Sequence, residues 1–221
     1  MATTRTILSV IGPHSGCGKS TFVTHLLRHV GGLGCLKVSP ARDRSEAPAS
    51  SEGTIGDDFY LEDAARLNRP GKDTALYLAA EAVRVERLRY RSDALLTSAP
   101  DNRCQEPEAK GALAAALRRF PAAVPVIVES SSAVRLLSPV GVVLVVRPPL
   151  REMKPTTEAI LSRVTDLLIN ASDREGPAAA AAERLRDEFP ALRPPYTWSA
   201  DLIAEPPPAQ MLTRLRTLLA G

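Results

Sequence analysis

The 221-residue sequence predicts an α/β fold in which a mostly parallel sheet is flanked by helices. Short apolar runs at 6–11, 124–129 and 140–146 have the length and composition of buried strands, and segments with helical spacing lie between them. A glycine-rich loop joins the first run to the first helical segment. The length and a hydrophobic fraction of 44% suit one globular domain spanning residues 1–221.

The stretch 11–21 has the pattern of a phosphate-binding loop, or P-loop. Its glycines allow a tight turn that points several backbone N–H groups at one anion, and the following helix adds the positive end of its dipole. Lys19 would reach the outer phosphates of a nucleotide, and Ser20 would offer its hydroxyl to Mg²⁺. The residues expected to bind the nucleotide here are Ser15, Gly16, Cys17, Gly18, Lys19, Ser20 and Thr21.

The loop departs from the pattern G-x-x-x-x-G-K-[ST] at one position. Pro13 stands where glycine is usual, and Gly12 lies one place early. The alternative is an ordinary glycine-rich turn between strand and helix, which does not account for Gly-Lys-Ser-Thr at the helix start. The motif and its context therefore predict a three-layer P-loop NTPase fold.

Charge and cysteine use limit the classes of partner. A net charge of +3 with scattered basic residues does not favour nucleic acid. Arg84, Arg87, Arg89 and Arg91 form a local concentration, interpreted as a solvated strand face or, alternatively, as an anion or RNA surface. Three cysteines lack CxxC spacing, and no apolar run approaches the ~20 residues of a membrane span. Without a signal-peptide segment, these features predict a cytoplasmic protein with no membrane contact.

Residues 31–56 predict a short strand followed by a long polar loop. Glycines end the first helix, and 35–38 has the composition of a buried strand. The loop at 39–56 has no apolar period, and in a P-loop enzyme it lies where a nucleotide-sensing switch is found. Asp43 is expected to help hold Mg²⁺ or a water there. The alternative is a solvated Asp43 in a disordered loop.

The middle of the chain predicts three helices and one strand. From the apolar spacing we expect helices at 57–67 and 73–82, a strand at 83–90 and a helix at 112–120. Pro70 and Gly71 mark a turn between the first two helices, and Asp73 would serve as the N-cap of the second.

An acidic residue, Glu129, ends the apolar run 124–129. In an open α/β sheet the ligand binds beyond the carboxyl ends of the strands. Glu129 would therefore hold the Mg²⁺ shell through water or orient an attacking water. The alternative is that Glu129 caps a neighbouring helix or loop.

The last third of the chain predicts alternating strands and helices. We expect a strand at 140–146, a helix from Pro155 with Ile160, Val164 and Leu167 on one face, a strand at 166–170, a helix at 177–189, a strand at 196–199 and a helix at 211–219.

This region also contains a candidate pair for base recognition. Asn170 and Asp173 follow a strand at the spacing with which many GTP-binding P-loop proteins recognise guanine. The Asp accepts from the ring N–H and exocyclic amine, which adenine does not offer in that arrangement. Ala171 replaces the usual Lys, and an ordinary turn is the alternative.

Four short segments carry a resemblance to one known family. Residues 15–21 are similar to its S-G-x-G-K-T-T, and Lys37 lies where its second strand ends in Ile-Lys. Residues 69–74 are similar to its P-G-K-D-[ST] motif, and 126–129 to its L-V-E-G strand. Together they resemble the molybdopterin-guanine dinucleotide biosynthesis adapter proteins, a branch of the P-loop GTPases that also includes metal-centre maturation GTPases. The chain departs from that pattern where 38–42 replaces a histidine-rich segment.

The resemblance implies GTP binding, slow Mg²⁺-dependent hydrolysis, frequent homodimerisation and a role in molybdopterin cofactor biosynthesis or delivery. The implied partner is a protein of that pathway or an enzyme that receives the cofactor. Lys19 and Glu129 would then be catalytic, and Ser20, Asp43 and Glu129 would serve the metal. The sequence contains no clear arginine finger or water-positioning Gln, which predicts a slow enzyme.

Two other classes of function remain open on the sequence. One is an ATP-dependent small-molecule kinase or ligase of the dethiobiotin synthetase type, which shares the loop and the sheet. The other is a metal-centre maturation adapter that binds a partner enzyme without hydrolysing nucleotide, with 39–56 as its contact surface. Nucleotide preference and substrate-stimulated turnover would separate the first from a GTPase.

Overall fold

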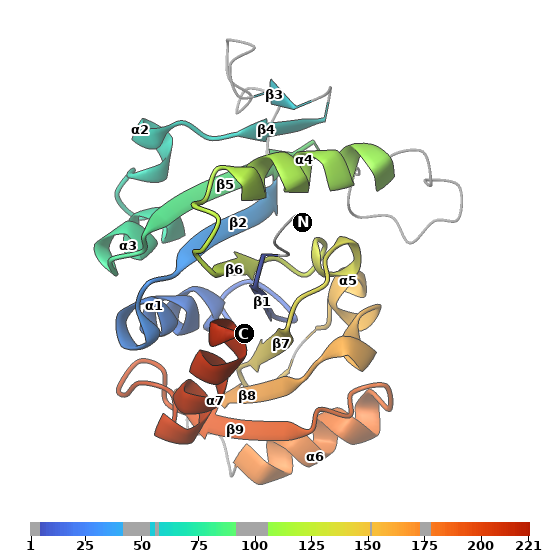
Figure 1. Cartoon of the computed structure of the whole chain (residues 1–221). Coiled ribbons are helices and arrows are strands. Elements are labelled where there is room, and N and C mark those ends of the chain that lie inside the picture. Colours follow the sequence, from blue (N-terminus) through green and yellow to red (C-terminus); the bar gives the residue numbers. More distant parts are fainter. Residues whose placement is uncertain (1–4, 42–53, 56–57, 92–105, 151, 173–177) are drawn as a thin grey trace.

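A computed structural model describes residues 5–41, 54–55, 58–91, 106–150, 152–172 and 178–221 of the chain. All the strands in these ranges belong to one sheet, in the order β3-β4-β5-β2-β6-β1-β7-β8-β9 (Figure 1). The strands are β1 Ile7–Ile11, β2 Gly34–Pro40, β3 Thr54–Ile55, β4 Phe59–Leu61, β5 Arg84–Tyr90, β6 Val126–Glu129, β7 Gly141–Val146, β8 Asp166–Asn170 and β9 Tyr196–Ala200. Pairing is parallel from β5 to β9, and only β3 and β4 add antiparallel edges among the described residues. This confirms the predicted α/β fold with a mostly parallel sheet.

Helices cover both faces of this sheet. Their bounds are α1 Lys19–Val30, α2 Ala64–Leu67, α3 Asp73–Ala79, α4 Glu106–Arg118, α5 Pro155–Glu158, α6 Ala178–Glu188 and α7 Ala209–Ala220, with single 3-10 turns at Val134–Leu136 and Leu161–Arg163. One face packs against α1, α3 and α7. The opposite face packs against α4 over β2, β5 and β6, and against α6 and the segment that follows α5 over β7 and β8. The predicted three layers are therefore present (Figure 1).

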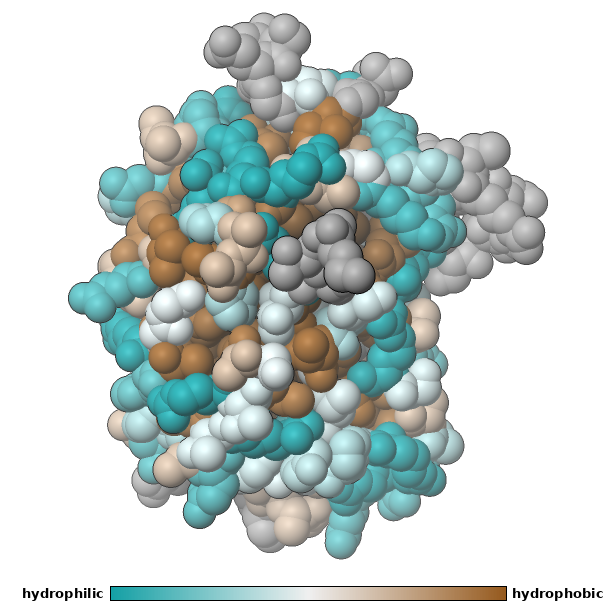
Figure 2. Space-filling model, in the orientation of Figure 1, coloured by the Kyte–Doolittle hydropathy of each residue, from teal (hydrophilic) through white to brown (hydrophobic). Residues whose placement is uncertain are grey.

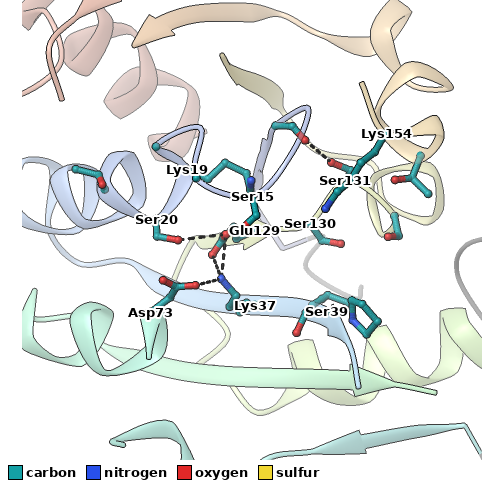
Figure 3. Close-up of a pocket in the computed structure, with 18 of the residues that line it drawn as sticks. Ser15, Lys19, Ser20, Lys37, Ser39, Asp73, Glu129, Ser130, Ser131 and Lys154 are labelled. Atoms are coloured by element: carbon teal, nitrogen blue, oxygen red, sulfur yellow. Dashed lines mark hydrogen bonds and ion pairs between the residues drawn. The ribbon is translucent and has the colours of Figure 1, made fainter. Parts of the chain in front are cut away.

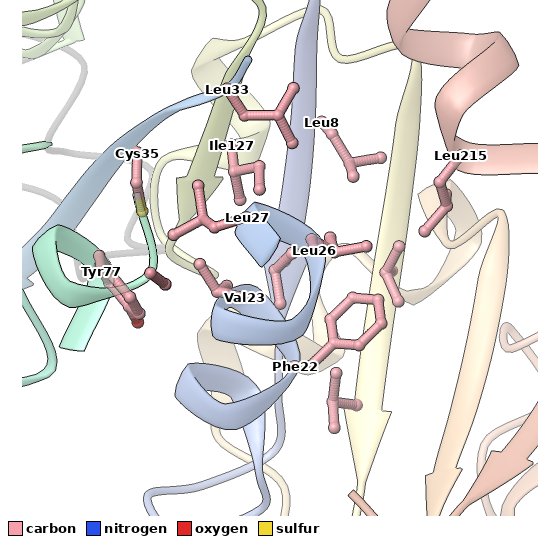
Figure 4. Packing of buried hydrophobic residues seen from close by; sticks show 14 of the residues in the cluster. Leu8, Phe22, Val23, Leu26, Leu27, Leu33, Cys35, Tyr77, Ile127 and Leu215 are labelled. Carbon is pink, nitrogen blue, oxygen red and sulfur yellow. The ribbon is translucent and has the colours of Figure 1, made fainter. Parts of the chain in front are cut away.

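The core beside the P-loop is built by α1. Phe22, Val23, Leu26 and Leu27 lie on one side of the helix and are buried against β1 and β6, as Figure 4 shows. The spacing of these four residues matches the 3.6-residue period of a helix with one apolar face. Leu215 of α7 reaches the same cluster, so α1 and α7 pack next to each other on this face of the sheet. This packing fixes the helix whose N-terminus carries Lys19 and Ser20.

The predicted helix at 57–67 is wrong. Phe59–Leu61 instead forms β4, antiparallel to β5, and the backbone N–H of Glu62 extends the pairing to Arg87. Only α2 is helical in this segment, and Asp63 caps it by accepting a hydrogen bond from the Arg66 backbone N–H at 2.8 Å. Consecutive aromatic residues favour a strand, and pairing with β5 outweighs the helical spacing of Leu61 and the alanines.

The predicted helix from Pro155 is also wrong beyond its first turn. α5 ends at Glu158 and is followed by a 3-10 turn. Ile160, Val164 and Leu167 do pack in one cluster, but Leu167 already belongs to β8. A short connection between two parallel neighbours can bury these residues without a continuous helix. The other predicted strands and helices are present, with two changes of bounds. The helix predicted at 73–82 ends at Ala79, and the helix predicted at 112–120 extends from Glu106 to Arg118.

In the described part of the chain, no helix is both long enough and apolar enough to cross a bilayer. On the face shown in Figure 2, apolar side chains lie among hydrophilic ones. The predicted loop 39–56 starts later than expected, because β2 continues to Pro40, and its residues 42–53 lie outside the described residues.

Candidate functional site

The P-loop follows β1 and ends where α1 begins, as the motif requires. Gly16 and Gly18 both have positive φ, at 82° and 102°. A Cβ on Gly18 would also lie 2.4 Å from Nδ2 of Asn170, whereas a Cβ on Gly16 would meet no atom within 4 Å. Gly18 is therefore required both for its backbone conformation and for the close approach of β8.

Two neighbouring segments hold the P-loop in place. Asn170, at the end of β8, donates from Nδ2 to the carbonyl of Cys17 at 3.3 Å and accepts from the Leu202 backbone N–H at 3.2 Å. On the other side, the Thr157 hydroxyl donates to the Gly12 carbonyl at 3.0 Å, and the backbone N–H of Lys154 donates to the Pro13 carbonyl at 3.0 Å. The loop is thus anchored by β8 and by the start of α5.

Lys19 lies over its own loop. Its ammonium donates to the His14 carbonyl at 2.8 Å and approaches Cys17 Sγ at 3.4 Å. Cys17 is fully buried, with its Sγ packed against Gly12 and Lys19, and it does not line the cavity, so its predicted part in nucleotide binding rests on its backbone. The other predicted loop residues line one cavity: Ser15, Gly16, Gly18, Lys19, Ser20 and Thr21.

That cavity measures about 650 Å³ and lies at the carboxyl ends of the parallel strands (Figure 3). Its walls come from the P-loop, the ends of β2, β5 and β6, and the segment before α5. Such a volume falls within the range of ligand pockets, and the carboxyl edge of an open α/β sheet is where ligands bind. Glu129 and Asn170 both line it.

A cluster of charged side chains lies directly under the P-loop. The ammonium of Lys37 donates to Glu129 Oε1 and Oε2 at 3.0 and 2.9 Å, and also contacts Asp73 Oδ2. The hydroxyl of Ser20 lies 3.5 Å from Glu129 Oε1, and Tyr77 donates its hydroxyl to Glu129 Oε2. Figure 3 shows Lys37 between the two carboxylates, with Ser20 beside Glu129. Oxygen ligands for a hard cation are thus gathered beside Ser20.

Strand register brings this cluster together. β6 lies between β1 and β2, so Glu129 stands beside Val10 on one side and Lys37 on the other. Asp73 comes from the first residue of α3, whose N-cap is Lys72 and has no side-chain cap bond. The prediction that Asp73 is the N-cap is therefore wrong, because its carboxylate faces Lys37 instead.

Mutual pairing sets the ionisation of the cluster. Burial alone would lower the pKa of Lys37, but the charges of Glu129 and Asp73 outweigh it and raise the pKa. Burial would raise the pKa of Asp73, and the charge and hydrogen bond of Lys37 lower it overall. Burial and the Glu129 carboxylate raise the pKa of Tyr77 well above its ordinary value, so the phenol stays protonated and donates.

Two of the predicted site residues, Asp43 and Asp173, lie outside the described residues. Of the predicted metal ligands, the structure brings together Ser20 and Glu129. The described residues contain no group of three or more His, Cys, Asp and Glu side chains that could hold a metal ion. Mg²⁺ bound through one or two protein oxygens, phosphate and water needs no such group.

Sequence reasoning missed two features of the site. Tyr77 was expected only on the second helix, and its role as a donor to Glu129 depends on how α3 docks. Arg87 and Arg89 were interpreted as a solvated strand face, yet their side chains are only 11% and 5% exposed and line the cavity. The loose alternation along 83–90 predicted a strand. It could not show which face carries a cavity.

A scan of protein-family models gives no match for this chain, and no curated protein matches it significantly. The site geometry and the short motifs therefore carry the functional argument.

Proposed function

We propose that this protein binds a Mg²⁺–nucleoside triphosphate at the P-loop and hydrolyses it slowly. The observation that carries the proposal is the approach of Glu129 to Ser20 at the first turn of α1, 3.5 Å apart and within the same cavity as the P-loop. An oxygen-only donor set at this place suits Mg²⁺. Ser20 and Glu129 would hold the ion directly or through water, and Asp73 stands next to them.

The chain's own groups account for a slow reaction. Backbone N–H groups of 15–20 and the ammonium of Lys19 would hold the phosphates, and Glu129 would orient a water toward the outer one. Bound Mg²⁺ would neutralise charge on the phosphates. Catalysis of phosphoryl transfer depends mainly on electrostatic stabilisation and positioning. Among the described residues, none is placed to act on the attacking water only, so we expect a slow reaction.

GTP is the proposed nucleotide. Asn170 lines the cavity and donates a hydrogen bond to the P-loop, which supports a part in base recognition. Asp173 would accept from the guanine ring. Calorimetry with GTP and ATP, with and without Mg²⁺, tests this choice. We expect GTP to bind more tightly, and Asp173→Ala to remove the preference; equal affinities in wild type would contradict the guanine assignment.

The nucleotide site itself is tested by Lys19→Ala. A charge-assisted hydrogen bond to phosphate is worth about 1.5–3 kcal/mol, so affinity should fall by roughly 10- to 100-fold. Lys110→Ala is the matched control, because Lys110 is exposed on α4 and pairs with Glu106 away from the cavity. Unchanged affinity in Lys19→Ala would show that the P-loop does not hold the phosphates.

For the physiological role we propose molybdopterin cofactor biosynthesis or delivery in the cytoplasm, with a homodimer as the working form. Lys37 and Asp73 belong to the motifs that resemble the adapter family. They support this role because Lys37 pairs with both Asp73 and Glu129 beside the P-loop. A Glu129→Gln variant that binds nucleotide without turnover should retain a molybdenum-cofactor biosynthesis protein or a receiving enzyme in a pull-down. Failure to retain either would argue against this role.

A second candidate is an ATP-dependent kinase or ligase acting on a small molecule. One observation favours it: the cavity continues beyond the P-loop and Lys37 to Ser39, Arg87 and Arg89. A pure hydrolase has no need of that extension. Turnover that rises several-fold when a small acceptor is added would favour this candidate over a GTPase.

A further inference from the structure

The part of the cavity farthest from Lys19 is formed by one face of two neighbouring strands. In the parallel register Lys37 stands beside Arg87, and Ser39 stands beside Arg89. Side chains alternate along a strand, so Val85, Arg87 and Arg89 share a face. Val85 is buried in the core with α3, whereas the two arginines lie beyond the N-terminus of that helix and line the cavity. Figure 3 shows Ser39 on β2 past Lys37, away from Lys19.

Both guanidinium groups are held in fixed positions. Glu62 approaches Arg87 Nη1 at 3.5 Å and Arg89 Nε at 3.6 Å from the end of β4. Burying two cations is costly unless acceptors surround them, and here one carboxylate bridges the pair. The arginines are thus preorganised side by side in a half-enclosed space, which is the arrangement that binds planar or tetrahedral oxyanions.

The hydroxyl of Ser39 receives more donors than it can satisfy. Nε and Nη2 of Arg87 each lie 3.2 Å from Ser39 Oγ, and Nη1 of Arg89 lies 3.5 Å from it. A hydroxyl oxygen has two lone pairs, so three N–H groups converge on an acceptor suited to two. A phosphate or carboxylate oxygen carries negative charge and more acceptor sites, and would serve these donors better.

From this convergence we propose that Ser39, Arg87 and Arg89 bind the phosphate or carboxylate group of a second, small anionic substrate. The proposal rests on the proposed nucleotide site and deepens it, because both ligands would share one cavity. The Lys37–Glu129–Asp73 cluster lies between the two binding regions. An acceptor held by the arginines would therefore face the outer phosphate across the Mg²⁺ position.

Calorimetry on the protein saturated with a non-hydrolysable GTP analogue and Mg²⁺ tests the proposal, since the P-loop is then filled. Inorganic phosphate is titrated in one arm and succinate in the other, which distinguishes the two anion classes. We expect one of them to bind at a single site. Arg89→Gln should weaken that binding at least 10-fold. Arg84→Gln is the control: it removes the same charge from the opposite face of β5, so it should leave the binding unchanged.

A second variant guards against misfolding of the arginine variant. Ser39→Asp places a carboxylate where the three donors converge, so it should raise the melting temperature and abolish anion binding. Ser39→Ala should retain binding, since the anion replaces the lost hydroxyl. Binding that is unchanged in both Arg89→Gln and Ser39→Asp, or absent for both anions in wild type, would overturn the proposal.

The two proposals fail separately. If the analogue does not bind wild type, the nucleotide assignment is wrong, and the same titrations are then run on nucleotide-free Lys19→Ala. If Lys19→Ala still binds the anion and the double variant Lys19→Ala with Ser39→Asp does not, the result supports the second site independently of the nucleotide site. Anion binding that is lost with Lys19→Ala alone would place the anion in the P-loop and contradict the second site.

Discussion

Two clusters of buried charge lie at opposite edges of the same sheet. At the amino end of β8, fully buried Asp166 accepts from Trp198 Nε1 at 2.9 Å and from Arg214 Nε at 3.0 Å. Arg214 also stacks on the Tyr196 ring, 3.6 Å from its centroid. This cluster ties α7 to β8 and β9, and Asp166 does not line the described cavity.

The second cluster, Lys37–Glu129–Asp73, lies at the carboxyl edge beside the P-loop. Both clusters contain a nearly inaccessible carboxylate paired with a basic side chain. They differ in their neighbours: Asp166 is surrounded by packed elements, whereas Glu129 faces a cavity and the hydroxyl of Ser20. A buried charged group can therefore serve only to hold packed elements together. A buried charged group that faces a cavity at the carboxyl ends of the strands indicates a functional site.

The largest expected effect is on the packing cluster. Asp166→Ala leaves the guanidinium of Arg214 and the indole N–H of Trp198 without their carboxylate, and breaking such a buried pair costs about 3–5 kcal/mol. Urea unfolding should show this loss, while nucleotide affinity of the folded variant stays unchanged. Glu183→Ala, an exposed charge on α6, is the control. A large fall in nucleotide affinity in Asp166→Ala would contradict the separation of the two clusters.

Lys37→Met should destabilise the protein by about 3 kcal/mol, because two carboxylates are left facing each other without a cation. The distinguishing result is the response to Mg²⁺. A divalent ion can replace the missing ammonium, so Mg²⁺ should restore much of the lost free energy of unfolding. Thermal melts in EDTA and in Mg²⁺ measure it. If Mg²⁺ stabilises Lys37→Met no more than Asp166→Ala, the carboxylates beside Ser20 are not a metal site.

β8 links both edges, since it begins at Asp166 and ends at Asn170 under the P-loop. Gly18→Ala would force a Cβ into Asn170 and strain a positive φ, costing about 1–3 kcal/mol in the loop. Nucleotide affinity should fall up to roughly 100-fold. Gly16→Ala has the same backbone strain without the collision and should lose less. Equal losses in the two variants would show that the contact with β8 does not matter for binding.

Local motifs allowed the P-loop, Glu129 and Asn170 to be predicted, since each follows from a few adjacent residues at a strand end. Lys37, Asp73 and Tyr77 depend on strand order and on how α3 docks, which no local pattern contains. An Asp that follows a turn can be explained as the N-cap of a helix without any distant partner, so Asp73 was interpreted as an N-cap.

The same limit explains the wrong helix at 57–67 and the unrecognised arginine pair. Residues 59–61 become a strand because β5 offers an unpaired edge, and that edge is formed by residues more than twenty positions later. Arg87 and Arg89 lie in a segment that was predicted to be a strand, and they were interpreted as part of a solvated strand face. The length and position of α3 decide which part of this face is covered by a helix. α3 does not cover Arg87, which lines the cavity instead.

The smallest expected effect concerns Asp73 and acid. Its side chain is 42% exposed, so pairing with Lys37 is screened by water and should contribute less than about 1 kcal/mol. The folded-state pKa is lowered from 3.8, so this contribution is present above about pH 4 and disappears as the pH falls through the lower folded value. Asp73→Asn should therefore be slightly less stable than wild type at pH 7, and the difference should disappear once the pH lies below the lowered folded-state pKa of Asp73. A difference that persists unchanged into acid would mean that Asp73 acts through packing rather than through its charge on Lys37.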